Sequence, residues 1–240
     1  MDPSEQLAHA AGSMLEHLSR HDRVLFLTTS NRWIGETGGE RPKSTRLALA
    51  LAERLGPKRV VHLDIPLLKI YACEGNVSTA RGNTCGGKDA VLNDPEKNPS
   101  GCHRCWASIN NPDDELWRVS KALFESDAVV FFGSIRWGQM NAHYQKLIER
   151  LTWIENRHST LGERNIVEHI EAGIVAIGHN WRGREVVETQ TQVLSFFGFQ
   201  TPPELSWNWS FTAPTDETNA SYKSAAAAFD RGVARISAPA

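Results

Sequence analysis

The chain has 240 residues, of which 40% are hydrophobic and 22% are charged, and its formal net charge is −2. This composition is ordinary for a globular protein, and the length suits one α/β domain with a substantial core. Because no large positive field is available, nucleic acid and an anionic membrane surface are excluded as main partners.

The N-terminal segment, residues 1–21, predicts an amphipathic helix ahead of the main fold. Asp2 can cap this helix, Pro3 suits its first position, and Glu5 can reach back to the cap. The segment has neither the basic start nor the apolar run of a secretory signal. No apolar run in the chain approaches the roughly 20 residues that cross a bilayer. We therefore expect a cytoplasmic protein with no membrane partner, in which thiols stay reduced.

From residue 23 onward, short apolar runs alternate with helical patterns. Strands are predicted at 23–29, 59–65, 127–134 and 172–179, with a weaker one at 203–211. Helices are predicted at 44–56, 112–126, 142–155, 184–198 and 219–236. This alternation predicts a parallel sheet covered by helices on both faces. Five strands favour a flavodoxin-like three-layer α/β sandwich of strand order 2-1-3-4-5 over a barrel, which typically needs about 250 residues. We expect residues 1–240 to form one domain, with a long cysteine-bearing loop inserted at 71–111.

Ligands of such sheets bind beyond the carboxyl ends of the strands, so the segment after the first strand is informative. It reads "TTSNRWIGETGGERPKST" and leads directly into a helix. A helix N-terminus with nearby hydroxyl groups binds phosphate well. The candidate donors are Ser30, Asn31, Arg32, Ser44 and Thr45. The segment lacks both G-x-x-x-x-G-K-[ST] and G-x-G-x-x-G, so neither a nucleoside triphosphate site nor a Rossmann dinucleotide site is indicated. The alternative is a long turn capped by Ser44.

The segment after the third strand reads "GSIRWGQMNAHYQKLIERL". Its glycines, Gly133 and Gly138, permit close approach to a flat ligand, and Trp137 offers a face for stacking. The alternative is a turn that carries an exposed tryptophan.

Together, these two segments resemble the NADPH-dependent FMN reductase and iron–sulfur flavoprotein families, which are flavodoxin-like. The matching positions are Ser30, Arg32, Ser44, Thr45, Ser134, Ile135, Arg136, Trp137, Gly138, Gln139, Met140, Lys146 and Arg150. The chain departs from the family pattern where Gly133-Ser134 replaces a proline and Glu149 replaces an aspartate. The resemblance covers roughly residues 23–200.

The resemblance implies bound FMN, with its phosphate on Ser30, Arg32, Ser44 and Thr45 and its ring along 134–140. Arg136 is the candidate for stabilising the reduced, anionic ring, and Trp137 for packing against it. A third contact would come from the residues that follow the fourth strand, which are His179, Asn180 and Trp181. Alternatively, His179 is a hydrogen-bonded loop histidine and Trp181 a surface aromatic or a subunit contact.

All four cysteines of the chain, Cys73, Cys85, Cys102 and Cys105, lie within residues 71–106. Four thiolates satisfy either tetrahedral zinc or an iron–sulfur cluster, although the spacing lacks the two C-x2-C pairs of a common zinc ribbon. A polar loop of this length buries too little apolar area to order itself, so we expect a metal centre to order it. Because the loop follows the second strand, we expect that centre near the flavin. The resemblance favours a [4Fe–4S] cluster, with structural zinc, free thiols and disulfides as alternatives.

These observations lead to the hypothesis of an FMN-dependent oxidoreductase that takes electrons from NAD(P)H and passes them to a small-molecule or protein acceptor. One alternative is an NAD(P)H-dependent FMN or quinone reductase with structural zinc or no metal. Another is a flavodoxin-like electron carrier with no substrate of its own. The resemblance also implies a homo-oligomer, a dimer or tetramer, for which Trp153, Arg157 and Trp181 are candidate contact residues.

Overall fold

A mostly parallel six-stranded sheet forms the centre of the protein. The computed structural model describes residues 2–32, 39–178, 181–210, 212 and 216–237, and the fold is given for these. The strands are β1 (Val24–Thr28), β2 (Val60–Asp64), β3 (Ala128–Arg136), β4 (Gln139–Met140), β5 (Glu171–Ile177) and β6 (Trp207–Trp209). Five of them pair in parallel in the order β2-β1-β3-β5-β6, and β4 pairs antiparallel with β3.

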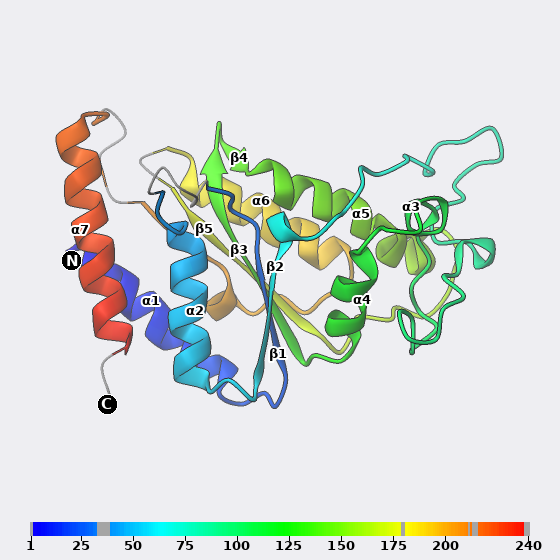
Figure 1. The fold of residues 1–240 in the computed structure, drawn as a ribbon, viewed down its shortest axis with the longest axis horizontal. Coiled ribbons are helices and arrows are strands. Elements are labelled where there is room, and N and C mark those ends of the chain that lie inside the picture. Colours follow the sequence, from blue (N-terminus) through cyan, green and yellow to red (C-terminus); the bar gives the residue numbers. More distant parts are fainter. Residues whose placement is uncertain (1, 33–38, 179–180, 211, 213–215, 238–240) are drawn as a thin grey trace.

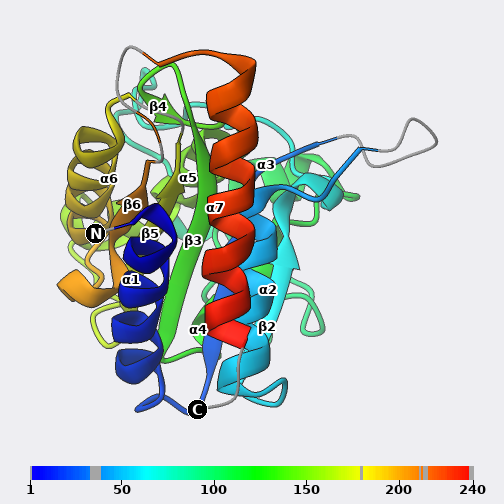
Figure 2. The ribbon, with the colours of Figure 1, turned by 90° about the vertical axis from the view of Figure 1, so that its left-hand side faces the viewer.

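The predicted flavodoxin-like sandwich and its 2-1-3-4-5 order are confirmed, because the five parallel strands follow that order along the chain. The sixth strand, β4, escaped the sequence pattern because it has only two residues and follows β3 after a tight turn. Helices cover both faces, as the views in Figure 1 and Figure 2 show. They are α1 (Pro3–Leu18), α2 (Lys43–Leu55), α3 (Trp106–Asn110), α4 (Leu116–Phe124), α5 (Ala142–Ser159), α6 (Gly183–Phe196) and α7 (Asn219–Ser237).

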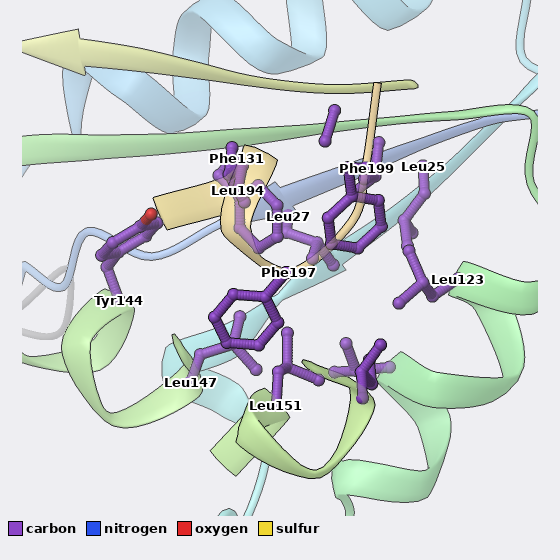
Figure 3. Close-up of a cluster of buried hydrophobic side chains, with 14 of the residues drawn as sticks. Leu25, Leu27, Leu123, Phe131, Tyr144, Leu147, Leu151, Leu194, Phe197 and Phe199 are labelled. Atoms are coloured by element: carbon purple, nitrogen blue, oxygen red, sulfur yellow. The ribbon is translucent and has the colours of Figure 1, made fainter. Parts of the chain in front are cut away.

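Strand β1 shows how the sequence divides the core between the two faces. Its alternate side chains point to opposite sides of the sheet. Leu25 and Leu27 pack with side chains of α4, α5 and α6, and Figure 3 shows part of this cluster. Val24 and Phe26 pack with side chains of α1, α2 and α7 on the other face. Every residue of β1 is therefore buried, as a continuous apolar run predicts.

The predicted N-terminal helix is present as α1, and its capping box forms between Asp2 and Glu5. It lies beside α7, as Figure 2 shows, so the two ends of the chain together cover one face of the sheet. The indole N–H of Trp209 donates to the backbone oxygen of Pro3 at 2.8 Å, which fixes α1 to strand β6. Within the described ranges, no helix has the length and apolar character that crossing a membrane requires.

The helix predicted from residue 112 begins instead at Leu116. The reason is Asp114, which the sequence pattern placed as an acid in the first helical turn. Its carboxylate is buried and accepts hydrogen bonds from the Tyr71 and Leu116 backbones and from the Ser108 hydroxyl. Because Asp114 accepts from the Leu116 backbone at the helix start and from Tyr71 across the chain, the residues before Leu116 form a turn and not helix.

The cysteine loop follows β2 and lies along α5, at the end of that helix far from β4, as Figure 1 shows. Asn98 organises one part of it, since its side-chain amide donates to Leu92 O at 3.0 Å and to His103 O at 3.2 Å. The Trp106 indole N–H donates to Thr84 O at 3.0 Å in another part. These polar contacts hold parts of the loop together, and the expectation that a metal centre completes its order stays a prediction.

Candidate functional site

A cleft at the carboxyl ends of β1, β3 and β5 brings together most of the predicted ligand-binding residues. It is lined by Ser30, Asn31, Arg32, Pro42, Lys43, Ser44, Ser134, Ile135, Arg136, Ile177, Gly178 and Tyr222. This is the position at which open parallel sheets bind ligands.

The N-terminus of α2 forms one wall of the cleft. The first backbone N–H groups of a helix have no partners inside it and carry partial positive charge. Over the described part of the chain, no side chain caps this helix, whose N-cap is Pro42. The Ser44 hydroxyl donates to the Ser30 hydroxyl at 2.7 Å, and both residues are buried. Free amides beside two hydroxyl groups are a suitable cradle for a phosphate.

Positive charge surrounds this cradle. Lys43 and Arg32 line the cleft, and Arg32 forms an ion pair with Glu40. Burial lowers the pKa of Lys43, and the negative charge of Glu40 only partly offsets that effect. A phosphate placed here would restore a charge partner to Lys43 and compete with Glu40 for Arg32.

Thr45 is the one predicted phosphate ligand whose side chain does not line the cleft. It faces a neighbouring pocket on the β2 side, together with Arg41, His62 and Asp64. Its hydroxyl oxygen is buried without a hydrogen-bond partner among the described residues. The structure therefore joins Ser30, Arg32 and Ser44 in one site and leaves Thr45 at its edge.

Gly133 explains why the end of β3 can pass so close to β1. A Cβ atom at this position would lie 2.4 Å from Met140 Cε and 2.7 Å from Thr29 Oγ1. The Asn141 side chain donates to Thr29 Oγ1 at 3.0 Å, and its backbone N–H donates to Ser134 O at 3.0 Å. These contacts hold the β1 end, the β3 end and the start of α5 together beneath the cleft.

The hairpin between β3 and β4 projects from the rim of the cleft. Trp137 and Gly138, its two turn residues, have φ angles of 50° and 72°, which is typical of a type I′ turn. Trp137 is 93% exposed. Arg182, in the neighbouring β5–α6 connection, also has a left-handed backbone, and its guanidinium lies 5.6 Å from the Trp181 ring. Two left-handed non-glycine residues at one rim indicate strain of the kind that gathers at functional sites.

The predicted ring-binding stretch thus divides into three parts. Ser134, Ile135 and Arg136 line the cleft. Trp137 and Gln139 are exposed on the hairpin, with Gly138 between them. The Met140 side chain is buried in the core. Trp181 is 50% exposed, whereas His179 and Asn180 lie outside the described residues.

The sequence argument did not assign five residues that line the cleft, which are Pro42, Lys43, Ile177, Gly178 and Tyr222. Lys43 had a usable signal, because it stands next to Ser44 in the first turn of α2. Tyr222 comes from α7, outside the region of family resemblance, and only the tertiary fold brings it to this wall.

The four cysteines lie along α5 and away from the cleft. Cys105 accepts a hydrogen bond from Arg150 at 3.4 Å, and Cys85 O accepts one from Asn156. These two α5 residues are about 12 Å and about 21 Å along the helix axis from Ala142 at its start, given a rise of about 1.5 Å per residue. The expectation that the cysteines stand near the flavin site is therefore wrong.

The cysteine sulfurs do not assemble a closed zinc site. Among the residues that the structure describes, no three cysteine sulfurs lie within 4.8 Å of one another. Tetrahedral zinc with bonds of about 2.3 Å would hold its sulfurs about 3.8 Å apart. An iron–sulfur cluster binds each thiolate to a different iron and spaces them more widely, so this distance test leaves a cluster compatible. Burial raises the pKa of Cys85 to about 12, and the charges of Cys105 and Cys73 add to the effect.

Arg150, a position of the family resemblance, anchors this loop. It is 1% exposed, and its guanidinium donates to both carboxylate oxygens of Asp114 at 2.8 Å and to Tyr71 O at 2.8 Å. Burial opposes ionisation of Asp114, but Arg150 outweighs it and holds the pKa of that carboxyl below its usual range. Trp153 and Arg157 are also buried beneath the loop, so their assignment as subunit contacts is wrong.

Comparison with solved structures supports the architecture. RosB with the bound intermediate OHC-RP (8-demethyl-8-formylriboflavin-5'-phosphate) is 13% identical, with a TM-score of 0.54 over 90% of this chain and 75% of that chain. The azoreductase AzrA is 14% identical, with a TM-score of 0.51 over 90% of this chain and 99% of that chain. Likenesses at these identities concern the fold, which is flavodoxin-like. The sequence matches no protein-family model and no curated protein.

Proposed function

We propose that this protein is an FMN-dependent oxidoreductase that takes electrons from NAD(P)H. The observation that carries the proposal is the cradle at the α2 N-terminus, where unpaired amides, the Ser30–Ser44 hydroxyl pair and Lys43 meet at the switch between strands. Such a cradle suits a terminal phosphate monoester of an otherwise flat ligand. The two similar structures, an azoreductase and a protein holding a riboflavin phosphate derivative, agree with this function.

The rest of the cleft suits the ring of FMN. Ile135 and Ile177 supply apolar walls, and Arg136 supplies a positive charge at the exposed edge. FMN, when bound, supplies the hydride and electron chemistry, while the protein positions it and tunes its charge. Arg136 would favour the reduced, negatively charged ring, and Trp137 on the hairpin would lie against the ring or its reaction partner. Because the cleft is shallow, a second copy of the chain would complete it in a dimer or tetramer.

The enzymatic part of the proposal is tested by flavin content and steady-state NAD(P)H oxidation. The purified chain should take up FMN and oxidise NADPH or NADH with a quinone or azo compound as acceptor. Arg136→Gln should lower turnover, whereas Arg164→Gln, at an exposed and distant site, should leave it unchanged. Protein that takes up FMN but oxidises neither nucleotide would favour the electron carrier, and protein that takes up no FMN would contradict both.

The proposal includes a [4Fe–4S] cluster on Cys73, Cys85, Cys102 and Cys105. Support comes from the gathering of all four thiols in one loop, with the cationic side chain of Arg150 against Cys105. Thiolate ligation would release the proton that Cys85 holds with a raised pKa, so cluster binding should be favoured at high pH. The test is the iron and sulfide content after anaerobic reconstitution, which Cys85→Ser should abolish.

A second candidate, an FMN or quinone reductase with no metal on the loop, is favoured by a specific observation. The Arg150–Asp114 ion pair and the hydrogen bonds of Asn98 hold the loop through contacts between protein groups. In that case, anaerobically reconstituted protein would contain no iron and would still bind FMN and oxidise NAD(P)H. This result would remove the cluster from the proposal and leave the flavin part intact.

A further inference from the structure

A cluster of two histidines and a glutamate lies at the end of the sheet opposite the cleft. His17 stands in the last turn of α1, His21 follows that helix, and Glu171 is the first residue of β5. All three belong to parts of the chain that the flavin proposal does not use. Their side chains are 13%, 19% and 20% exposed, so the cluster is largely shielded from water but reachable from it.

The three side chains converge on one point. His17 Nε2 lies 2.6 Å from Glu171 Oε2, and His21 Nε2 lies 2.9 Å from the same oxygen. One ligand atom from each residue lies within 4.8 Å of the other two. The imidazole rings are tilted by 42° with centroids 5.8 Å apart, so they point at a common position without stacking.

This convergence is the ligand set of a transition-metal site. In the metal-free chain the Nε2–H of each ring donates to Glu171 Oε2, and a metal would replace those two protons and leave each ring protonated on Nδ1. Two imidazoles with one carboxylate bind zinc in many proteins. Imidazole ligands favour zinc and its neighbours over magnesium and calcium. Tetrahedral bonds of about 2.0–2.1 Å would space the ligand atoms about 3.3 Å apart, so side-chain shifts of about half an ångström would admit the ion.

A second carboxylate stands behind one of the ligands. Glu204 Oε2 lies 3.8 Å from His17 Nδ1, the ring nitrogen that faces away from Glu171. A carboxylate behind a metal-bound histidine fixes the tautomer and orients the ring. At 3.8 Å Glu204 makes no hydrogen bond to this ring, but a small side-chain shift would let it accept the Nδ1–H of a metal-bound His17.

We propose that His17, His21 and Glu171 form a zinc site, with Glu204 as the carboxylate behind His17. The fourth position of the ion would be taken by water. The site joins the end of α1 to the start of β5, so the ion would clamp the N-terminal helix onto the sheet. Zinc binding would then stabilise the folded chain, because Glu171 lies 154 and 150 residues from the two histidines and meets them only after folding.

The test compares zinc content and thermal unfolding of the untagged 240-residue chain and its variants after removal of bound metal. Equilibrium dialysis should show one more tightly held zinc ion per chain in the wild type than in the H17Q/H21Q double variant. His9→Gln, which changes an exposed histidine of the same helix, should match the wild type. Because the cysteine loop is unchanged in all three proteins, any zinc bound there cancels in the comparison.

Zinc at about a hundredfold excess over its Kd should raise the Tm of the wild type by about 5–10 °C more than that of the double variant. Glu204→Gln should weaken zinc binding about 10- to 100-fold without abolishing it. Glu171→Gln keeps the size of its side chain and should lose the ion even if the double variant folds poorly. Equal zinc content and equal Tm response in the wild type, Glu171→Gln and the double variant would overturn the proposal.

Discussion

Trp137 combines two features that ordinarily lower stability. Its backbone is left-handed, which costs a non-glycine residue roughly 1–2 kcal/mol, and its ring is 93% exposed. A type I′ turn prefers Asn-Gly at the positions that Trp137 and Gly138 occupy. A tryptophan thus occupies a turn position at the rim of the cleft where the backbone favours asparagine, which agrees with a role in binding.

We predict that Trp137→Asn stabilises the protein by about 1 kcal/mol while lowering turnover, because Asn tolerates the left-handed backbone but cannot pack against a flat ligand. Urea unfolding and steady-state NAD(P)H oxidation measure the two effects. Phe196→Asn removes another exposed aromatic ring from the helical backbone of α6 and should bring no stability gain. Unchanged turnover in Trp137→Asn would remove the hairpin from the site.

His103 is a buried histidine whose neutral form the fold requires. Its Nδ1 lies 2.7 Å from the Ser120 hydroxyl, and its ring packs near Trp153. Burial lowers its pKa to about 4, and the charge of Arg150 contributes to the shift. Because the unfolded pKa is about 6.5, this residue contributes its stability above pH 6.5 and loses it as the pH falls towards 4.

We predict that the wild-type free energy of unfolding falls by roughly 3 kcal/mol more than that of His103→Gln between pH 7 and pH 4. Glutamine does not titrate, so the difference between the two proteins isolates this site from the other acids and histidines. Urea unfolding across the pH range measures it. A gap between the two proteins that stays constant with pH would mean that His103 keeps an ordinary pKa in the fold.

At the scale of elements, the N-terminus of α2 determines what the cleft can bind. Hydrogen bonds to a charged group contribute about 1.5–3 kcal/mol each, so removing two hydroxyl donors has a large expected effect. We predict that the S30A/S44A double variant binds FMN at least about a hundredfold more weakly than the wild type, as fluorescence titration would measure. Ser78→Ala, an exposed serine in the cysteine loop, is the control. Equal affinities would place the phosphate elsewhere.

Helix α5 connects the cleft to the cysteine loop, and Arg150 is its main link to that loop. Removing one partner of a buried ion pair leaves an uncompensated charge. We predict that Arg150→Met lowers the free energy of unfolding by about 3–5 kcal/mol. Arg164→Gln, which breaks the exposed pair with Glu168, should cost less than about 0.5 kcal/mol. Guanidinium unfolding measures the free energies of unfolding of both variants. Equally small losses in Arg150→Met and Arg164→Gln would show that other contacts hold the loop.

At the scale of the whole molecule, local sequence patterns predicted the fold. The apolar run of β1 and the capping residues of α1 follow from neighbours in the chain, and both appear as predicted. The helix start at Pro112 failed because Asp114 is committed to Arg150, 36 residues away in sequence. No local pattern contains that contact.

The residues of the candidate site also fall into two groups, those that local sequence predicts and those that only the tertiary fold places. Ser30 follows the end of β1, Ser44 lies in the first turn of α2 and Arg136 ends β3, so these three could be assigned from sequence. Tyr222 enters the cleft from the last helix, and the Thr45 side chain turns to the adjacent pocket, so neither placement could be derived without the packed structure. The cysteine loop was misplaced because its polar contacts with α5 link residues far apart in the chain.

The account depends most on the claim that the cleft recognises FMN through its phosphate. Parallel fluorescence titrations of the 240-residue chain with FMN and with riboflavin, which lacks only the phosphate, test this claim directly. We predict saturable FMN binding at least about a hundredfold tighter than riboflavin binding, because the phosphate accepts several charge-assisted hydrogen bonds. Equal affinities for the two flavins, or no binding of either, would contradict the account.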